Sequence, residues 1–138
     1  MLACMDAAQA IADLTEISPQ IRNVVAAGAD GAVLGSNVPA EAAATLLLER
    51  AKRLLDDAEE MRPGVAQLEA ATQTGSVFVV RDGGRLIAAT TTPEPTVGLV
   101  FYDLKTCLRS IEIEEAKPKP ARRRAPAKKK EGAEDAAS

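Results

Sequence analysis

Apolar side chains recur along this chain with a spacing of three to four residues in some segments and of two in others. The first spacing is typical of helices that bury one face, and the second is typical of strands. In segment 3–17 the apolar residues follow the helical spacing. Pro19 ends this predicted helix, because proline disfavours helical conformation in the residue before it.

A β-hairpin is predicted next, around the turn Gly28-Ala29-Asp30-Gly31. Its first strand is expected to span Ile21 to Ala27, and its second strand Ala32 to Val38. The Asp-Gly pair supplies the positive φ angles that tight hairpin turns require.

Three further strands are predicted in the middle of the chain. They are Val65 to Thr74, Ser76 to Arg81 and Arg85 to Thr91, separated by turns at Gln73-Thr74-Gly75 and Asp82-Gly83-Gly84. In the last two strands both alternating faces are apolar or small, whereas a sheet with one face in water shows a cleaner alternation. We therefore expect helices on both faces of the sheet.

Between the hairpin and these strands, segment 39–61 predicts a long helix with a wide apolar face. One stripe consists of Leu47, Ala51, Leu54, Ala58 and Met61, and a second stripe beside it consists of Ala44, Leu48 and Leu55. A helix that packs on one sheet needs only one stripe, and we expect the first to serve. The second stripe (Ala44, Leu48 and Leu55) is then expected to form a dimer or partner interface. Replacing Leu48 or Leu55 by a charged residue should yield monomers.

The chain is predicted to end in a helix that starts at Val97, followed by a tail of different composition. Residues 117–138 consist mainly of Lys, Arg, Pro and Ala and include no large apolar residue. Such a segment cannot bury enough surface to offset the entropy lost on ordering. We expect a folded domain over residues 1–116 and a disordered basic tail over residues 117–138.

Charge divides the chain at the same place. Residues 1–116 hold 9 basic and 17 acidic side chains, a net charge of −8, and residues 117–138 hold 8 basic and 3 acidic ones, a net charge of +5. The tail carries two basic triplets, Arg122, Arg123 and Arg124, and then Lys128, Lys129 and Lys130. These triplets predict salt-dependent binding of nucleic acid or another polyanion. The alternative is a solubilising tail that folds back loosely on its own acidic body.

Composition excludes several kinds of chemistry. The chain has no His and only two cysteines, Cys4 and Cys107, so triad catalysis, His-ligated metal sites and a four-thiolate zinc site are excluded. The acidic run 56–60 would fan around a helix without converging on a metal ion, and we expect it to form a solvated helix face. The turn 82–85 lacks the Lys-Ser/Thr of a phosphate-binding loop. We expect no enzymatic activity, no cofactor and no metal. No apolar run approaches the ~20 residues of a membrane span, so we expect a cytoplasmic protein.

The order of elements is helix, two strands, helix, three strands, helix. Together with three stretches of sequence, it resembles the roadblock/dynein light chain family. The stretches are VVAAGADGAVLGS at 24–36, GSVFVVRDGGRLIAATT at 75–91 and VGLVFYDLKTCLRSI at 97–111. The resemblance covers about residues 6–113, and the basic tail is not part of the family pattern.

This resemblance implies an α+β fold, similar to longin and profilin-like proteins, in the order α-β-β-α-β-β-β-α. A five-stranded antiparallel sheet would carry helices on both faces. Members typically form homodimers through the central helix and the strand after it, here Pro39–Met61 and Val65–Thr74. They bind small Ras-like GTPases as regulators or scaffolds, or attach cargo to dynein, and a bacterial branch works with a partner GTPase in polarity and signalling operons. With no dynein-specific feature in the chain, we expect a member of the bacterial branch.

Overall fold

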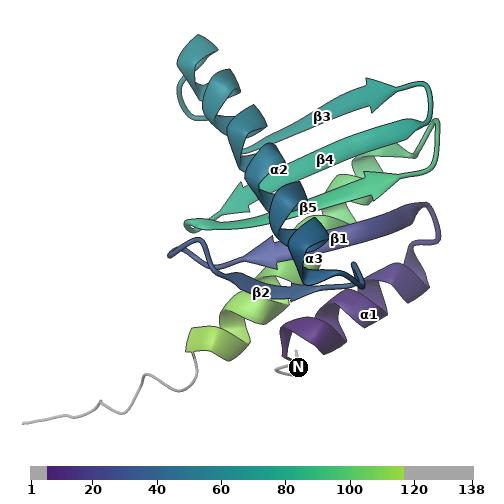
Figure 1. The fold of residues 1–138 in the computed structure, drawn as a ribbon, viewed down its shortest axis with the longest axis vertical. Helices are drawn as coiled ribbons and strands as arrows, with labels where there is room; N and C mark the ends of the chain where they lie inside the picture. The colour runs from purple at the N-terminus through teal and green to yellow at the C-terminus, as the bar shows by residue number, and fades with distance from the viewer. Residues whose placement is uncertain (1–5, 117–138) are drawn as a thin grey trace, which may run out of the picture.

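The structure, a computed structural model, describes residues 6–116 (Figure 1). Its elements are α1 (Ala7–Ile17), β1 (Ile21–Ala27), β2 (Val33–Ser36), α2 (Glu41–Met61), β3 (Gln67–Thr72), β4 (Gly75–Asp82), β5 (Arg85–Thr91) and α3 (Val97–Ala116). The predicted order of elements is confirmed, and β1 and β5 have the predicted bounds. The predicted tail and its basic residues lie outside the described residues.

The five strands form one antiparallel sheet in the order β2-β1-β5-β4-β3. β5 lies at the centre, where Ala89 pairs with Val24 of β1 on one side and with Phe78 of β4 on the other. β2 and β3 are the two edge strands. Because β3 pairs only with β4 among the described residues, its outer edge has backbone groups without a neighbouring strand.

Helices cover both faces of the sheet, as predicted. Figure 1 shows α2 crossing one face, while α1 and α3 lie behind the other. Neighbouring residues of each central strand point to opposite faces, so that Phe78 packs toward α1 and α3 whereas Val79 packs toward α2. The α1–α3 core includes Ile11, Leu14, Phe78, Ile87, Leu104 and Leu108, and the α2 core includes Val25, Leu48, Leu55, Val79 and Ala88.

The predicted strands β2 and β3 are each shorter in the structure than in the prediction, and side-chain hydrogen bonds explain the difference at the end of β2 and at the start of β3. After β2, the Asn37 side chain accepts a hydrogen bond from the Val24 N–H and donates one to the Arg22 carbonyl, both at 2.7 Å. Before β3, the Val65 N–H donates to a carboxylate oxygen of Glu59 rather than to a strand. In both places a side chain supplies a hydrogen bond to backbone at the point where a strand was expected to run on.

Candidate partner-binding surface

The face of α2 that packs on the sheet is not the predicted one. Ala44, Leu48 and Leu55, which were expected to face a partner, are buried at 2%, 7% and 0% exposure. They pack with Ala51 against apolar side chains of β1, β4 and β5. The expectation that this stripe is the free one is therefore wrong. Two adjacent stripes on a helix do not indicate by themselves which of them meets the sheet.

The stripe that was expected to meet the sheet lies instead along the flank of α2. Leu54 is 38% exposed and Met61 is 82% exposed, while Leu47 and Ala58 are half-buried. Among its residues only Ala51 is buried. The intervals along this stripe are four, three, four and three residues, which is the spacing of a seam between two packed helices. The buried residues Ala44, Leu48, Ala51 and Leu55 follow the same spacing, so the spacing alone does not identify the free stripe.

Apolar residues of the sheet extend this flank toward β3. Leu68 of β3 pairs with Val79, and Ala70 of β3 pairs with Val77, so all four lie on the α2 face of the sheet. Leu68, Ala70 and Val77 are only half-buried, because α2 lies mainly over β1 and β5. The α2 flank and this part of the sheet together form one surface, which we call the α2–β3 surface. It consists of Leu47, Leu54, Ala58, Met61, Leu68, Ala70 and Val77.

A carboxylate links the two parts of this surface. The two oxygens of Glu59, near the end of α2, accept hydrogen bonds from the backbone N–H groups of Gly64 (2.8 Å) and Val65 (3.1 Å). The Arg81 guanidinium of β4 donates to the same carboxylate and to the Val65 carbonyl, each at 3.2 Å. The two backbone N–H groups, and after them Arg81, hold the pKa of Glu59 below its usual value.

In the sequence, Glu59 is one of several carboxylates on a helix face that is expected to be solvated, and nothing in the pattern reveals this role. Asp56, Asp57 and Glu60 are exposed, as expected for a solvated helix face. Glu59 differs from them because the chain turns back on itself after Arg62, which brings two backbone donors to its side chain. The bend at Arg62-Pro63-Gly64 is visible in the sequence, but the carboxylate that it engages is not.

Cys107 is a buried member of the α1–α3 core. Its side chain is 6% exposed, and burial raises the pKa of the thiol to about 12, with a smaller contribution from the charge of Asp13. The thiol is therefore protonated at neutral pH, whereas nucleophilic attack requires the thiolate.

Two other expectations from the sequence concern the tail and the membrane. The predicted polyanion-binding residues Arg122, Arg123, Arg124, Lys128, Lys129 and Lys130 lie outside the described residues, and their role stays a prediction. Among residues 6–116, no helix is long and apolar enough to cross a membrane.

No protein-family model matches the chain, and no curated protein matches it. Several solved structures match it in fold. A Roadblock/LC7 domain from Streptomyces avermitilis superposes with a TM-score of 0.66 at 17% sequence identity, over 80% of this chain and 97% of that one. The chain has the Roadblock/LC7 fold. MglB from Myxococcus xanthus superposes on it with a TM-score of 0.61 at 14% identity, over 80% and 95% of the two chains.

The profilin-like part of the expectation is confirmed as well. LokiProfilin1, in its complex with rabbit actin, matches with a TM-score of 0.55 at 12% identity, over 82% of this chain and 98% of that one. The same fold therefore occurs in roadblock proteins and in an actin-binding profilin. Because a shared fold leaves the partner open, the function of this roadblock fold has to be argued from its own exposed surfaces.

Proposed function

We propose that this chain is a non-enzymatic, cytoplasmic homodimer that binds, scaffolds or regulates a small Ras-like GTPase. The α2–β3 surface is the observation that carries the proposal. It places exposed apolar side chains of a helix beside a sheet edge that, within residues 6–116, has no neighbouring strand.

A second copy of the chain fits this surface in two ways at once. Leu54 and Met61 present the seam of α2, and a helix with the same seam packs against it because the spacing is self-complementary. The outer edge of β3 offers backbone donors and acceptors that β3 of a second copy satisfies. The pairing would join two five-stranded sheets and cover Leu68 and Val77.

Support for the GTPase partner comes from the resemblance to the roadblock family in the sequence and from the Roadblock/LC7 fold. Support for a non-enzymatic role comes from the chemistry of the chain. It contains no histidine, and its one described cysteine is buried with a raised pKa. If GTP hydrolysis changes on binding, we expect the chain to act by positioning the GTPase's own groups.

The dimer is tested by replacing one exposed leucine with a charge. Leu54→Glu places a carboxylate on the seam of α2, and we expect monomers because the charge would have to be desolvated in a dimer. Leu99→Glu is the matched control, since Leu99 is 49% exposed on α3, in the helix layer on the other face of the sheet. Light scattering coupled to gel filtration gives the mass of each variant. A monomeric native chain, or two dimeric variants, would contradict the proposed interface.

The GTPase is tested by affinity capture from an extract of the source cells. The full chain is immobilised, and the extract is applied with either GDP or a non-hydrolysable GTP analogue. A captured Ras-like GTPase is then purified, and its binding to the native chain and to the Leu54→Glu variant is measured. We expect binding that depends on the nucleotide. If no Ras-like GTPase binds in either nucleotide state, the GTPase part of the proposal fails, whatever the mass measurement shows.

A further inference from the structure

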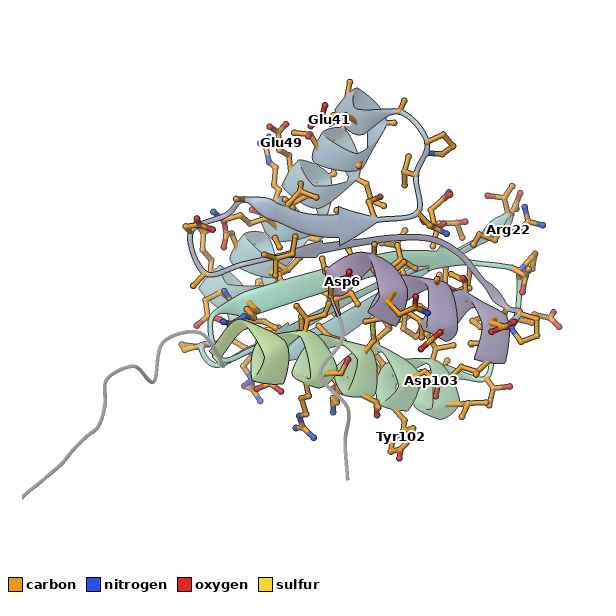
Figure 2. All side chains as sticks on the ribbon, turned by 90° about the horizontal axis from the view of Figure 1, so that it is seen from below. Asp6, Arg22, Glu41, Glu49, Tyr102 and Asp103 are labelled. Atoms are coloured by element: carbon orange, nitrogen blue, oxygen red, sulfur yellow. The ribbon has the colours of Figure 1, made fainter. Side chains whose placement is uncertain are left out.

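A groove runs between α1 and α3, on the face of the sheet opposite α2. Its volume is about 370 Å³, and it lies between the second half of α1 and the part of α3 from Tyr102 to Ser110. Figure 2 shows α1 and α3 side by side, with Tyr102 and Asp103 on the outer side of α3. The α1–α3 groove is distinct from the α2–β3 surface, because the sheet separates them.

The floor of the groove is apolar and its rim is acidic. Leu14 is buried beneath it, while Ile17 and Tyr102 stand at its sides with 69% and 66% of their surface exposed. The charged residues that line it are Asp13, Glu16 and Asp103. All three are acidic, and no described cation forms an ion pair with any of them. The groove therefore favours a positively charged segment with small or aliphatic side chains.

We propose that the basic segment 117–130 of this same chain folds back and occupies the α1–α3 groove, with Arg122–Arg124 against its carboxylates. The composition of the segment fits the groove, since alanine and proline separate its two basic triplets and no large apolar residue has to be accommodated. The exposed ring of Tyr102 offers an arginine a face for a cation–π contact. Charge complementarity is strong, because the tail carries +5 and the preceding residues −8.

The length of the tail also fits. Asp103 lies about 20 Å back along the axis of α3 from Ala116, at a rise of 1.5 Å per residue. Arg122 follows Ala116 by six residues, and an extended stretch of that length spans up to about 20 Å. The segment between them contains Pro118 and Pro120, which favour an extended backbone. When this stretch is extended along α3, the first basic triplet therefore reaches the level of Asp103.

Attachment to the same chain makes even a weak contact effective. A tethered segment meets its site at an effective concentration in the millimolar range, so a few salt-sensitive contacts suffice for substantial occupancy. Docking would neutralise part of the acidic face and cover Tyr102. A partner that binds the basic tail and carries more negative charge than the groove would displace the tail from it.

Paramagnetic relaxation in the full chain tests the proposal. A nitroxide is attached at Ala125→Cys in a Cys4→Ser background, where Cys107 stays unlabelled because it is buried. We expect the amide signals of 10–17 and 102–110 to broaden at low salt, and the broadening to disappear in high salt, where charges are screened. Broadening that is no stronger at the groove than along α2, or that survives high salt unchanged, overturns the proposal.

Two triple variants with the same change in charge identify the site. Asp13→Asn, Glu16→Gln and Asp103→Asn remove the groove carboxylates, and we expect the broadening to be lost. Glu49→Gln, Asp56→Asn and Glu60→Gln remove three exposed carboxylates of α2 and should leave it unchanged. Equal effects of the two triples would reduce the contact to net charge and overturn a groove-specific site.

A mixture of two differently labelled chains shows whether the tail docks on its own chain or on another molecule. An isotope-labelled chain without nitroxide, mixed with the unlabelled nitroxide chain, should show no broadening at the groove. Broadening there would place the tail on another molecule and contradict the proposal.

Tyr102 is the only tyrosine and the chain has no tryptophan, so its fluorescence reports on the groove. Replacing Arg122, Arg123 and Arg124 by Gln should increase its quenching by acrylamide, and unchanged quenching argues against docking.

Discussion

At the residue scale, the carboxylate of Glu59 links the end of α2 to the segment that leads into β3. It holds the N–H groups of Gly64 and Val65, and it is held in turn by Arg81. A carboxylate offers two acceptor oxygens with negative charge, and all three partners use them. One ionised side chain therefore contributes to the relative position of the α2 seam and the β3 edge, beside the packing of Leu48 and Leu55 on the sheet.

Glu59→Gln should destabilise the fold at neutral pH, because an amide has a single acceptor oxygen and no charge for Arg81. The folded-state pKa of Glu59 is lowered from 4.5, so its contribution is fully present above that value and is lost as the pH falls through the lower folded-state pKa. Urea unfolding of the native and variant chains over a falling pH series measures this. We expect the difference in unfolding free energy to shrink below pH 4.5, with Glu60→Gln as the exposed control. A difference that stays constant with pH would exclude ionisation of Glu59 as its cause.

At the element scale, the sequence predicts all eight elements but not the orientation of α2. The turns are readable because Asp-Gly and Gly-Gly pairs allow backbone angles that other residues avoid. The sequence does not show in the same way which side of α2 faces the sheet, because Leu54 and Leu55 are chemically identical and adjacent. Which of them is buried depends on Val25, Val79 and Ala88, on strands that are distant in sequence.

The first and last residues of β2 and β3 were not predicted correctly either, because they also depend on contacts between separate elements. Asn37 is one residue beyond β2 but bonds to the backbone of Arg22 and Val24 across the hairpin. Glu59, on another element, binds the backbone N–H of Val65 before the start of β3. Interactions of this kind join residues that the chain only brings together by folding, so the spacing along the sequence does not reveal them.

The assignment of the α2 faces leads to a stability prediction. Leu55→Ala should cost about 2–5 kcal/mol, because Leu55 is fully buried and its loss leaves a cavity against the sheet. Leu46→Ala on the same helix should change the stability by no more than ~0.5 kcal/mol, because Leu46 is 46% exposed. Urea unfolding measures both. A charged residue at Leu48 or Leu55 should for the same reason unfold the domain rather than release monomers. Similar losses for Leu55→Ala and Leu46→Ala would mean that α2 is rotated from its position here.

At the scale of the whole molecule, the sheet divides two surfaces that have different chemistry. The α2–β3 surface is apolar and self-complementary in spacing, whereas the α1–α3 groove is rimmed by Asp13, Glu16 and Asp103. Because they lie on opposite faces, occupation of one leaves the other accessible. A homodimer built on α2 and β3 therefore carries two α1–α3 grooves on its outer faces.

The proposed dimerisation through α2 and β3 would make the thermal stability depend on protein concentration. If unfolding is coupled to dissociation, a tenfold higher concentration favours the folded dimer by about 1.4 kcal/mol, and Tm rises. We expect this rise for the native chain and for Leu99→Glu, and its loss for Leu54→Glu. Scanning calorimetry over a hundredfold concentration range measures it. A Tm that is independent of concentration for the native chain would exclude dissociation-coupled unfolding over that range. It would also leave the apolar seam of α2, with Met61 82% exposed, in need of a different partner.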